Sequence, residues 1–473
     1  MIKQNDLRFN TLNTCGECAR RKTNCRTGTL CEPVRHELRP YGGIRFTSDG
    51  FDCALPVTID SHSVCSYECL YCFSDNLTGH TDAKSKPIGQ TSLNALERIF
   101  AGEGGVQGGH IRTALRYHKK RNGYPCPVQL GGINDPCDNI ERQQGWLLRF
   151  IDLAIKYNQP VRISTKGVLL MEKDYLAAIS KAPHLFWVAF SIITPDDELL
   201  EKIDLRAPNA TKRLACMAAL SAAGVKTSLR FRPILAGISD STKNEPKAYK
   251  TRIEKAAAAG ARAISYEVGF YPSRLPSYAK GKWDTLERLT SLPLKQIYQS
   301  FGKNQTCLRA SYKWTENIMH AIYDEAKKNK LTVGVSDPCW KQLTESGCCC
   351  GILPEDEVFG NWEVENATNW LLKAKNDRNL IIKATDIIPE WAYHVKQSQM
   401  FAQSAGPLSC YNARHAVWSE KLLDIWNNPK AQRSPLEYFQ GALVPVKLPN
   451  GELGYKYKGL ERRYPSKIAG WKV

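Results

Sequence analysis

Three closely spaced cysteines are the residues of this sequence best suited to metal chemistry. Cys65, Cys69 and Cys72 have the spacing C-x3-C-x2-C. Three thiolates on one short loop can bind three irons of a cubane 4Fe-4S cluster, and the fourth iron then stays open to a ligand from outside the protein. A zinc ion would require a fourth protein ligand, and the nearby His62 precedes the cysteines at an unusual spacing. The motif therefore favours an iron–sulfur cluster over a zinc knuckle.

Further candidate residues follow predicted strands. Gly131 and Gly132 lack a Cβ atom and would let a ligand approach the main chain closely, although a plain turn is an alternative explanation. Arg230 and Arg232 alternate with apolar residues, so both point to the same face of one strand. An anionic ligand could compensate their charge there, as could a buried pair with Glu267.

A regular alternation of strands and helices must position these residues. We expect strands at 54–60, 128–132, 161–165, 186–192, 226–234 and 263–268, and helices at 93–100, 142–157, 172–181, 211–223 and 245–259. This order predicts an α/β fold in which right-handed crossovers form a partial (β/α)6 barrel of the TIM type. Chemistry in such barrels takes place at the carboxyl ends of the strands, where the candidate residues fall.

The segments on either side of the barrel complete the predicted organisation. Residues 1–50 are basic and rich in cysteine, and residues 271–473 contain weaker helical patterns, a short strand at 332–335 and a hairpin around Asn450-Gly451. We therefore expect three parts: a cysteine-rich segment 1–50, a barrel 51–270 and a C-terminal extension 271–473.

The motif CSYECLYC resembles the cluster motif of the radical S-adenosylmethionine (SAM) superfamily. Within that superfamily the chain is similar to the spore photolyase and DNA-repair-photolyase-like family, through GGINDP, RISTKG, AFSIITPDDELL, RAPNATKRL and LRFRPILAG. The likeness covers residues 51–270. It implies that a 4Fe-4S cluster cleaves SAM to a 5′-deoxyadenosyl radical, which abstracts a hydrogen atom from the substrate. It also implies an electron donor such as flavodoxin or ferredoxin.

The resemblance implies roles for single residues. Those expected to bind the cofactor are Tyr71, Gly131, Gly132, Asp135, Ser164, Lys166, Ser191 and Arg232. Tyr71 would stack on adenine, and Lys166 would pair with the methionyl carboxylate. Asp135 would bind the methionyl ammonium, although Ile133 stands where the superfamily has Glu. Cys137 is the candidate catalytic hydrogen donor, since spore photolyase uses a cysteine of this region, but the positions do not match residue for residue.

Two further groups of cysteines flank the barrel motif. The first consists of Cys15, Cys18, Cys25 and Cys31, and its spacing C-x2-C-x6-C-x5-C suits a structural zinc or a second iron–sulfur cluster. The other consists of Cys339, Cys348, Cys349 and Cys350. An auxiliary cluster, a zinc site shared between the two groups, or free cysteines packed as small hydrophobic residues are the alternatives for it.

Composition limits the classes of protein and partner. With 42% hydrophobic and 24% charged residues the chain is globular rather than disordered. The formal net charge of +18, together with basic and aromatic residues at 112–121 and 454–473, favours nucleic acid as a partner. We also expect a cytoplasmic protein without a membrane segment, because no signal-peptide pattern and no apolar run of about 20 residues is present.

These observations together predict a radical SAM enzyme that acts on a nucleic-acid base or lesion. One alternative keeps the radical chemistry but assigns it to a peptide or a small metabolite. The other is a cysteine-rich, metal-binding nucleic-acid protein that is not an enzyme.

Overall fold

The computed structural model describes residues 39–46, 55, 57–72, 74, 88–103, 111–112, 114–115, 123–272, 277–298, 307–360, 367–388, 390–393, 417–431 and 434–459. Several predictions concern residues outside these ranges. They are the metal site of Cys15, Cys18, Cys25 and Cys31, most of the basic segment 112–121 and the tail beyond residue 459. The side chain of Cys339 also lies outside the described part.

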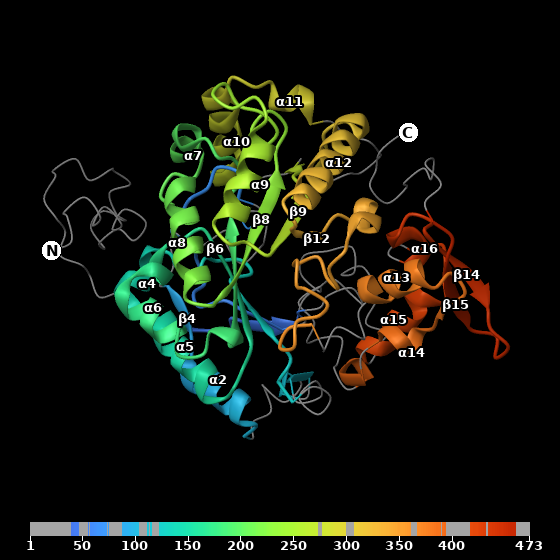
Figure 1. The fold of residues 1–473 in the computed structure, drawn as a ribbon. Coiled ribbons are helices and arrows are strands. Elements are labelled where there is room, and N and C mark those ends of the chain that lie inside the picture. Colours follow the sequence, from blue (N-terminus) through green and yellow to red (C-terminus); the bar gives the residue numbers. More distant parts are fainter. Residues whose placement is uncertain are drawn as a thin grey trace, which may run out of the picture.

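An eight-stranded sheet forms the centre of the described structure (Figure 1). Its order is β12-β9-β8-β7-β6-β5-β3-β2, so that β2 and β12 form the two edges. The strands are β2 (Ile44–Phe46), β3 (Val57–Ile59), β5 (Val128–Leu130), β6 (Val161–Thr165), β7 (Phe186–Ser191), β8 (Lys226–Ile234), β9 (Ala263–Val268) and β12 (Thr332–Val335). All neighbours pair in parallel except β2 and β3. The predicted α/β fold with a partial barrel is confirmed.

The sheet is one parallel strand wider than the six units predicted from the sequence. The additional strand, β12, pairs with β9 from Thr332 opposite Ala263 to Val335 opposite Tyr266. It comes from the segment 271–473, which was expected to lie outside the barrel. The division of the chain into three parts stays a prediction, but the parallel sheet itself continues past residue 270.

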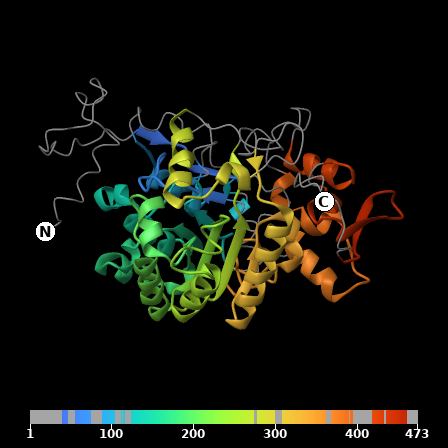
Figure 2. The ribbon, with the colours of Figure 1, turned by 90° about the horizontal axis from the view of Figure 1, so that it is seen from above.

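Helices connect the strands and cover the outer side of the sheet. They are α2 (Leu93–Ala101), α4 (Asn139–Gln144), α5 (Trp146–Lys156), α6 (Lys173–Ile179), α7 (Asp197–Ile203), α8 (Ala210–Ala222), α9 (Ala248–Ala258) and α12 (Tyr312–Lys328). Figure 2 shows the helices side by side in an arc. The single helix predicted at 142–157 is wrong, because Gly145, with a φ of 58°, separates α4 from α5. Glycine tolerates this left-handed conformation at no steric cost.

The two faces of the sheet differ in chemistry. Strands β6 and β7 are buried along their whole length, as expected for parallel strands covered on both faces. The helix side is apolar, whereas polar side chains occupy alternate positions on the other side, which we call the inner face. Its members used below are Gln129, Arg162, Ser164, Ser191, Arg230, Arg232 and Ser265.

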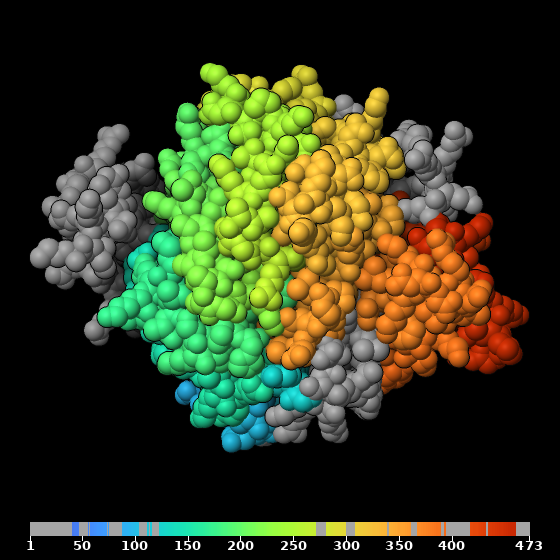
Figure 3. Space-filling model, in the orientation of Figure 1, coloured from blue at the N-terminus to red at the C-terminus, as the bar shows by residue number. Residues whose placement is uncertain are grey.

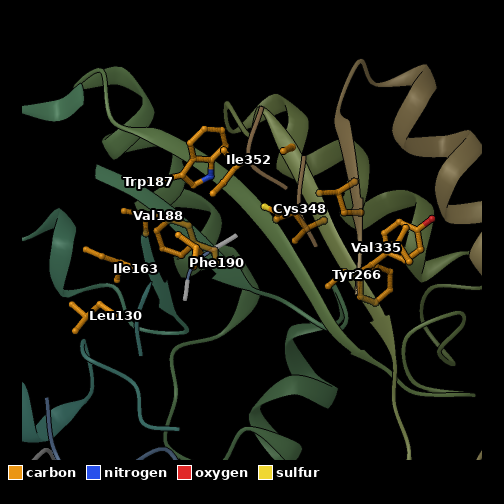
Figure 4. Packing of buried hydrophobic residues seen from close by; sticks show 14 of the residues in the cluster. Leu130, Ile163, Trp187, Val188, Phe190, Tyr266, Val335, Cys348 and Ile352 are labelled. Carbon is orange, nitrogen blue, oxygen red and sulfur yellow. The ribbon is translucent and has the colours of Figure 1, made fainter. Parts of the chain in front are cut away.

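The segment that follows β12 lies against this inner face. Its main chain is tied to β12 by the N–H of Ser346, which donates to the carbonyl of Val333 at 2.9 Å. Figure 4 shows Cys348 and Ile352 among the buried side chains contributed by the strands. Farther along, Asp356 forms a 2.6 Å ion pair with Lys226 at the start of β8. Residues 344–360 therefore fill the barrel from inside.

The remaining elements form smaller units around the sheet. They are β1 (Arg39–Tyr41), β4 (Gly89–Thr91), β10 (Tyr271–Pro272), β11 (Cys307–Leu308), α10 (Ser277–Thr290), α11 (Leu294–Ile297), α13 (Ala367–Asn376), β13 (Ile381–Ile382), α14 (Ala384–Ile387), α15 (Trp418–Trp426), α16 (Pro435–Tyr438), β14 (Leu443–Lys447) and β15 (Leu453–Tyr457). The predicted hairpin is confirmed as β14 and β15. Figure 3 shows the C-terminal elements, in orange and red, beside the helices of the barrel. Among the described residues, no helix has the length and apolar character needed to cross a bilayer.

Candidate functional site

The three cysteines lie on a loop, residues 60–72, that begins at the carboxyl end of β3. The loop is held from two sides: Asp138 accepts a hydrogen bond from the main-chain N–H of Ser66 at 2.8 Å, and the N–H of Leu70 donates to the last carbonyl of α7 at 2.9 Å. Glu68, between the first two cysteines, has a φ of 50°. Residues other than glycine rarely adopt this conformation, so the surrounding contacts impose the shape of the loop.

Each thiol has a different environment. Cys69 is 6% exposed, and its Sγ lies 2.8 Å from Nζ of Lys166. Cys65 and Cys72 are partly exposed, and the Sγ of Cys72 lies 2.8 Å from the hydroxyl of Ser74. The most buried of the three sulfurs is thus the one in contact with a cation.

A buried ionic network centred on Asp204 contacts the cysteine loop. Asp204 and Arg213 form a fully buried 2.7 Å ion pair, and Asp204 also accepts hydrogen bonds from Lys166 at 3.2 Å and from the hydroxyl of Tyr71. Burial alone would raise the pKa of Asp204, but Lys166 and Arg213 hold it below its usual range. The ammonium of Lys166 is 4.5 Å from the centre of the Tyr71 ring. Asp204 therefore fixes both Lys166 and Tyr71 beside Cys69.

The donor set fits an iron–sulfur cluster. Burial raises the pKa of Cys65 and of Cys69, and Lys166 opposes the rise at Cys69, so a cation or a metal is required to hold these sulfurs as thiolates. In the described part of the chain, no group of three or more His, Cys, Asp or Glu side chains surrounds a position for one metal ion. A cubane places one thiolate on each of three irons and does not need three sulfurs around a single point.

The Gly131-Gly132 turn is held by the chain's own atoms. Asp60, buried at the end of β3, accepts hydrogen bonds from the N–H groups of Gly132 at 2.7 Å and Ile133 at 2.9 Å. A Cβ on Gly132 would lie 2.6 Å from Cγ2 of Thr58, and Gly131 has a φ of 82°. These contacts account for both glycines through packing and turn geometry, and their contact with a cofactor stays a prediction.

Asp135 joins the ends of β5 and β6. Its carboxylate accepts hydrogen bonds from the hydroxyl of Thr165 at 2.6 Å, the main-chain N–H of Lys166 at 2.6 Å and that of Cys137 at 3.0 Å. Burial raises its pKa, and these three donors oppose the rise. The carboxylate of Asp135 thus accepts hydrogen bonds from three groups of the protein itself, and it orients the main chain of Lys166. Its predicted contact with the methionyl ammonium would add a fourth donor.

Cys137, the predicted hydrogen donor, is enclosed. It is 1% exposed, and its carbonyl accepts a hydrogen bond from the hydroxyl of Tyr67 at 2.7 Å. A Cβ on Gly167 would lie 2.5 Å from the Cβ of Cys137, so the turn after β6 packs directly on it. Burial raises the pKa of this thiol well above its usual value. The surroundings would have to open before Cys137 could meet a substrate.

The inner face carries the other predicted residues. The hydroxyl of Ser164 accepts hydrogen bonds from Arg162 at 2.8 Å and Gln129 at 3.1 Å, and that of Ser191 accepts one from Arg230 at 3.3 Å. Arg232 donates to the carbonyl of Cys349 and lies 3.7 Å from Glu267. The pairing with Glu267 that was left open from the sequence is therefore present for Arg232.

The structure brings Cys65, Cys69, Cys72, Tyr71 and Lys166 together and places Asp135 behind them. Sequence reasoning missed the residues that hold this group in place, which are Asp60, Asp138, Asp204 and Arg213. Two of them were visible as signals: Asp60 is the last residue of a predicted strand, and Arg213 lies within RAPNATKRL. Their partners are distant in sequence, and no local pattern identifies such pairs.

Comparisons with known proteins add the following. No protein-family model matches the chain. It is 26% identical over 215 residues to an uncharacterized protein, Rv2578c, of Mycobacterium tuberculosis and to an uncharacterized protein of Mycobacterium bovis. The match covers 45% of this chain and 58% of each relative, which is less than two thirds of their length.

Solved structures with a similar arrangement include two enzymes. Spore photoproduct lyase complexed with dinucleoside spore photoproduct matches 64% of this chain and 80% of its own, with 16% identity and a TM-score of 0.43. SuiB of Streptococcus suis bound to S-adenosylmethionine matches 60% of this chain and 50% of its own, with 11% identity and a TM-score of 0.36. Spore photoproduct lyase, whose family the sequence motifs resemble, is thus among the solved structures to which this chain is similar.

Proposed function

We propose that this protein is a radical SAM enzyme. The observation that carries the proposal is the cysteine loop at the carboxyl ends of the parallel strands. It contains three thiols, and Lys166 contacts that of Cys69. Cys65, Cys69 and Cys72 would each bind one iron of a 4Fe-4S cluster. When bound, that cluster supplies the electron that cleaves SAM and gives a 5′-deoxyadenosyl radical.

The protein's own residues would position and shield this chemistry. Lys166 is fixed by Asp204 at one side of the loop and presents a cation beside the sulfurs. A compact positive charge at this position suits the carboxylate of the methionyl group. Tyr71, held by its hydroxyl on Asp204, closes the loop on the protein side and limits access of water.

Loss of one cluster ligand tests the proposal. Cys69→Ala should abolish the cluster and, with it, the formation of 5′-deoxyadenosine from SAM under reducing, anaerobic conditions. The measurements are iron and sulfide content, the electron paramagnetic resonance signal of the reduced cluster, and chromatography of the nucleoside product. Cys126→Ala is the matched control, because Cys126 is also buried but precedes β5, outside the cysteine loop. Equal 5′-deoxyadenosine from both variants would reject the proposal.

The substrate is proposed to be a nucleic-acid base or lesion, altered by hydrogen abstraction. The support is the net charge of +18 and the basic, aromatic tail of the sequence. Binding to DNA or RNA should weaken steeply as salt rises, and isotope should pass from a labelled oligonucleotide into 5′-deoxyadenosine. An affinity that ignores ionic strength would favour a peptide or small-metabolite substrate instead. A reduced flavodoxin or ferredoxin is the proposed source of the electron.

A further inference from the structure

Three guanidinium groups gather on the inner face of the barrel. Arg162 belongs to β6, and Arg230 and Arg232 belong to β8, two positions apart and therefore on the same side of the strand. Burial, followed by the charges of Arg232 and Arg162, lowers the pKa of Arg230 to about 10, and Glu267 opposes this fall. Within the part of the chain that the structure describes, Glu267 is the carboxylate that acts on Arg230 and Arg232, so these three cations face one anion.

Two of the three arginines, Arg162 and Arg232, donate hydrogen bonds to the chain. Arg162 donates to the amide oxygen of Gln129 at 2.6 Å and to the carbonyl of Cys350 at 3.3 Å. Arg232 donates to the carbonyl of Cys349 and lies 3.7 Å from Glu267. These two guanidinium groups thus have fixed positions and hold the segment 344–360 on the sheet.

Arg230, two positions before Arg232 on β8, differs from both. Among the described residues, its side chain makes one hydrogen bond, a 3.3 Å contact with the neutral hydroxyl of Ser191, and no carboxylate lies within 4 Å of it. The residue is partly exposed, and its nitrogens are not among the buried unsatisfied atoms. Its N–H groups are therefore directed to accessible space while the surrounding charge is repulsive. A guanidinium so placed is destabilising unless an anion joins it.

We propose that Arg230, with Arg162 and Arg232 beside it, binds a phosphate group of the substrate. The surplus of two positive charges matches a phosphate dianion, such as a terminal phosphate, better than a single carboxylate, and the planar guanidinium can bind two of its oxygens. Calling the phosphate part of the substrate rests on the proposed function, whereas the phosphate site itself does not.

The position of Arg230 places that phosphate near the cysteine loop. Arg230 is the register partner of Ser191, the last residue of β7. Lys166 follows the last residue of the neighbouring strand β6, and the cysteine loop follows β3 at the same edge of the sheet. Carboxyl ends of parallel strands meet at one edge, so the phosphate would anchor a substrate whose remainder extends towards the cluster.

Binding of inorganic phosphate to the full-length chain tests this site. Titration calorimetry and thermal unfolding would compare the natural protein with Arg230→Gln, Arg230→Lys and the control Arg262→Gln, which removes an exposed arginine at the start of β9. Arg230→Gln should weaken phosphate binding roughly 10- to 100-fold, and Arg262→Gln should not change it. In phosphate-free buffer Arg230→Gln should unfold at the same or a higher temperature, because it removes an uncompensated charge.

The opposite results have distinct meanings. Unchanged phosphate affinity in Arg230→Gln, or a lowered unfolding temperature in phosphate-free buffer, would overturn the proposal and leave Arg230 a structural residue. Acetate that competes as well as phosphate would also overturn it in favour of a carboxylate site. A separate assay tests the proposed function: if the natural protein forms no 5′-deoxyadenosine from SAM, that function is wrong, whatever the phosphate measurements give.

Discussion

At the scale of single residues, Asp204 has the largest effect on the candidate site. One buried carboxylate accepts hydrogen bonds from Lys166, Tyr71 and Arg213. It thereby fixes the cation that touches Cys69 and the ring beside it. Removing one partner from such a network leaves buried charges unpaired, which costs more than the pair itself contributes.

Asp204→Asn should therefore lower the free energy of unfolding by about 3–5 kcal/mol. The measurement is urea unfolding of the full-length protein at pH 7. The matched control is Glu198→Gln, which breaks an exposed 2.7 Å pair with Lys202 and should leave the free energy of unfolding nearly unchanged. Equal losses in the two variants would contradict the role given to Asp204.

The stability difference between the natural protein and Asp204→Asn should also depend on pH. Because the folded-state pKa of Asp204 is depressed, the stability from its ionised form is complete above the unfolded-state pKa of about 3.9 and is lost as the pH falls below it. The stability difference between the natural protein and Asp204→Asn should be constant above about pH 5 and shrink below about pH 4. A difference that grows on acidification would contradict this assignment.

At the scale of elements, the turn after β5 decides where the cysteine loop lies. Asp60 leaves β3 and bonds to Gly132 in the turn, so the first two parallel strands are joined just where the cluster motif begins. Gly132 fits because Thr58 occupies the space that a Cβ would need. Substitutions in this turn therefore act on the cysteine loop through packing.

Gly132→Ala should destabilise the protein by about 1–3 kcal/mol, because its Cβ would lie 2.6 Å from Cγ2 of Thr58 and 2.6 Å from Nη2 of Arg45. Adding Thr58→Ser, which removes that methyl group, should recover part of the loss. Gly42→Ala is the control, since a Cβ there would meet no atom within 4 Å. Thermal unfolding of the four proteins is the measurement, and a double variant no better than Gly132→Ala would exclude the Thr58 contact as the cause.

Much of the arrangement of elements could be predicted from the sequence. The strands β6, β8, β9 and β12 have the predicted bounds, since each is a short segment with apolar or alternating apolar residues between turn residues or glycines. Periodicity could not show that Gly145 breaks a helix, because apolar residues continue on both sides of it. Periodicity also could not show that Asp204 pairs with Arg213 or that Arg232 donates to the carbonyl of Cys349. These contacts join residues that are distant in sequence and form only when the chain has folded.

At the scale of the whole molecule, the barrel is completed by residues far along the chain. β12 pairs with β9, and the segment after it lies on the inner face, where Ser265 donates to the carbonyl of Cys349 at 2.8 Å. Phe359 then packs edge-on against Trp187, with ring centres 5.8 Å apart. The strands of the barrel and residues 344–360 thus form one folding unit.

Truncated chains would test whether the barrel requires β12 and residues 344–360 or ends at residue 270. A chain ending after residue 272 lacks β12 and exposes the β9 edge and the inner-face arginines, so it should aggregate. A chain ending after residue 360 retains the sheet and its closing segment and should remain folded. Size-exclusion chromatography and circular dichroism would compare them. A monomeric, folded 1–272 chain would show that β12 is dispensable.

The late closing segment also affects synthesis of the protein. A growing chain displays its cysteine motif to the cell long before residues 344–360 have left the ribosome, and until then Arg162 and Arg232 lack the carbonyls that hold them. Contacts between such distant positions form slowly. The inner face of the nascent barrel is thus uncovered until residues 344–360 have been synthesised.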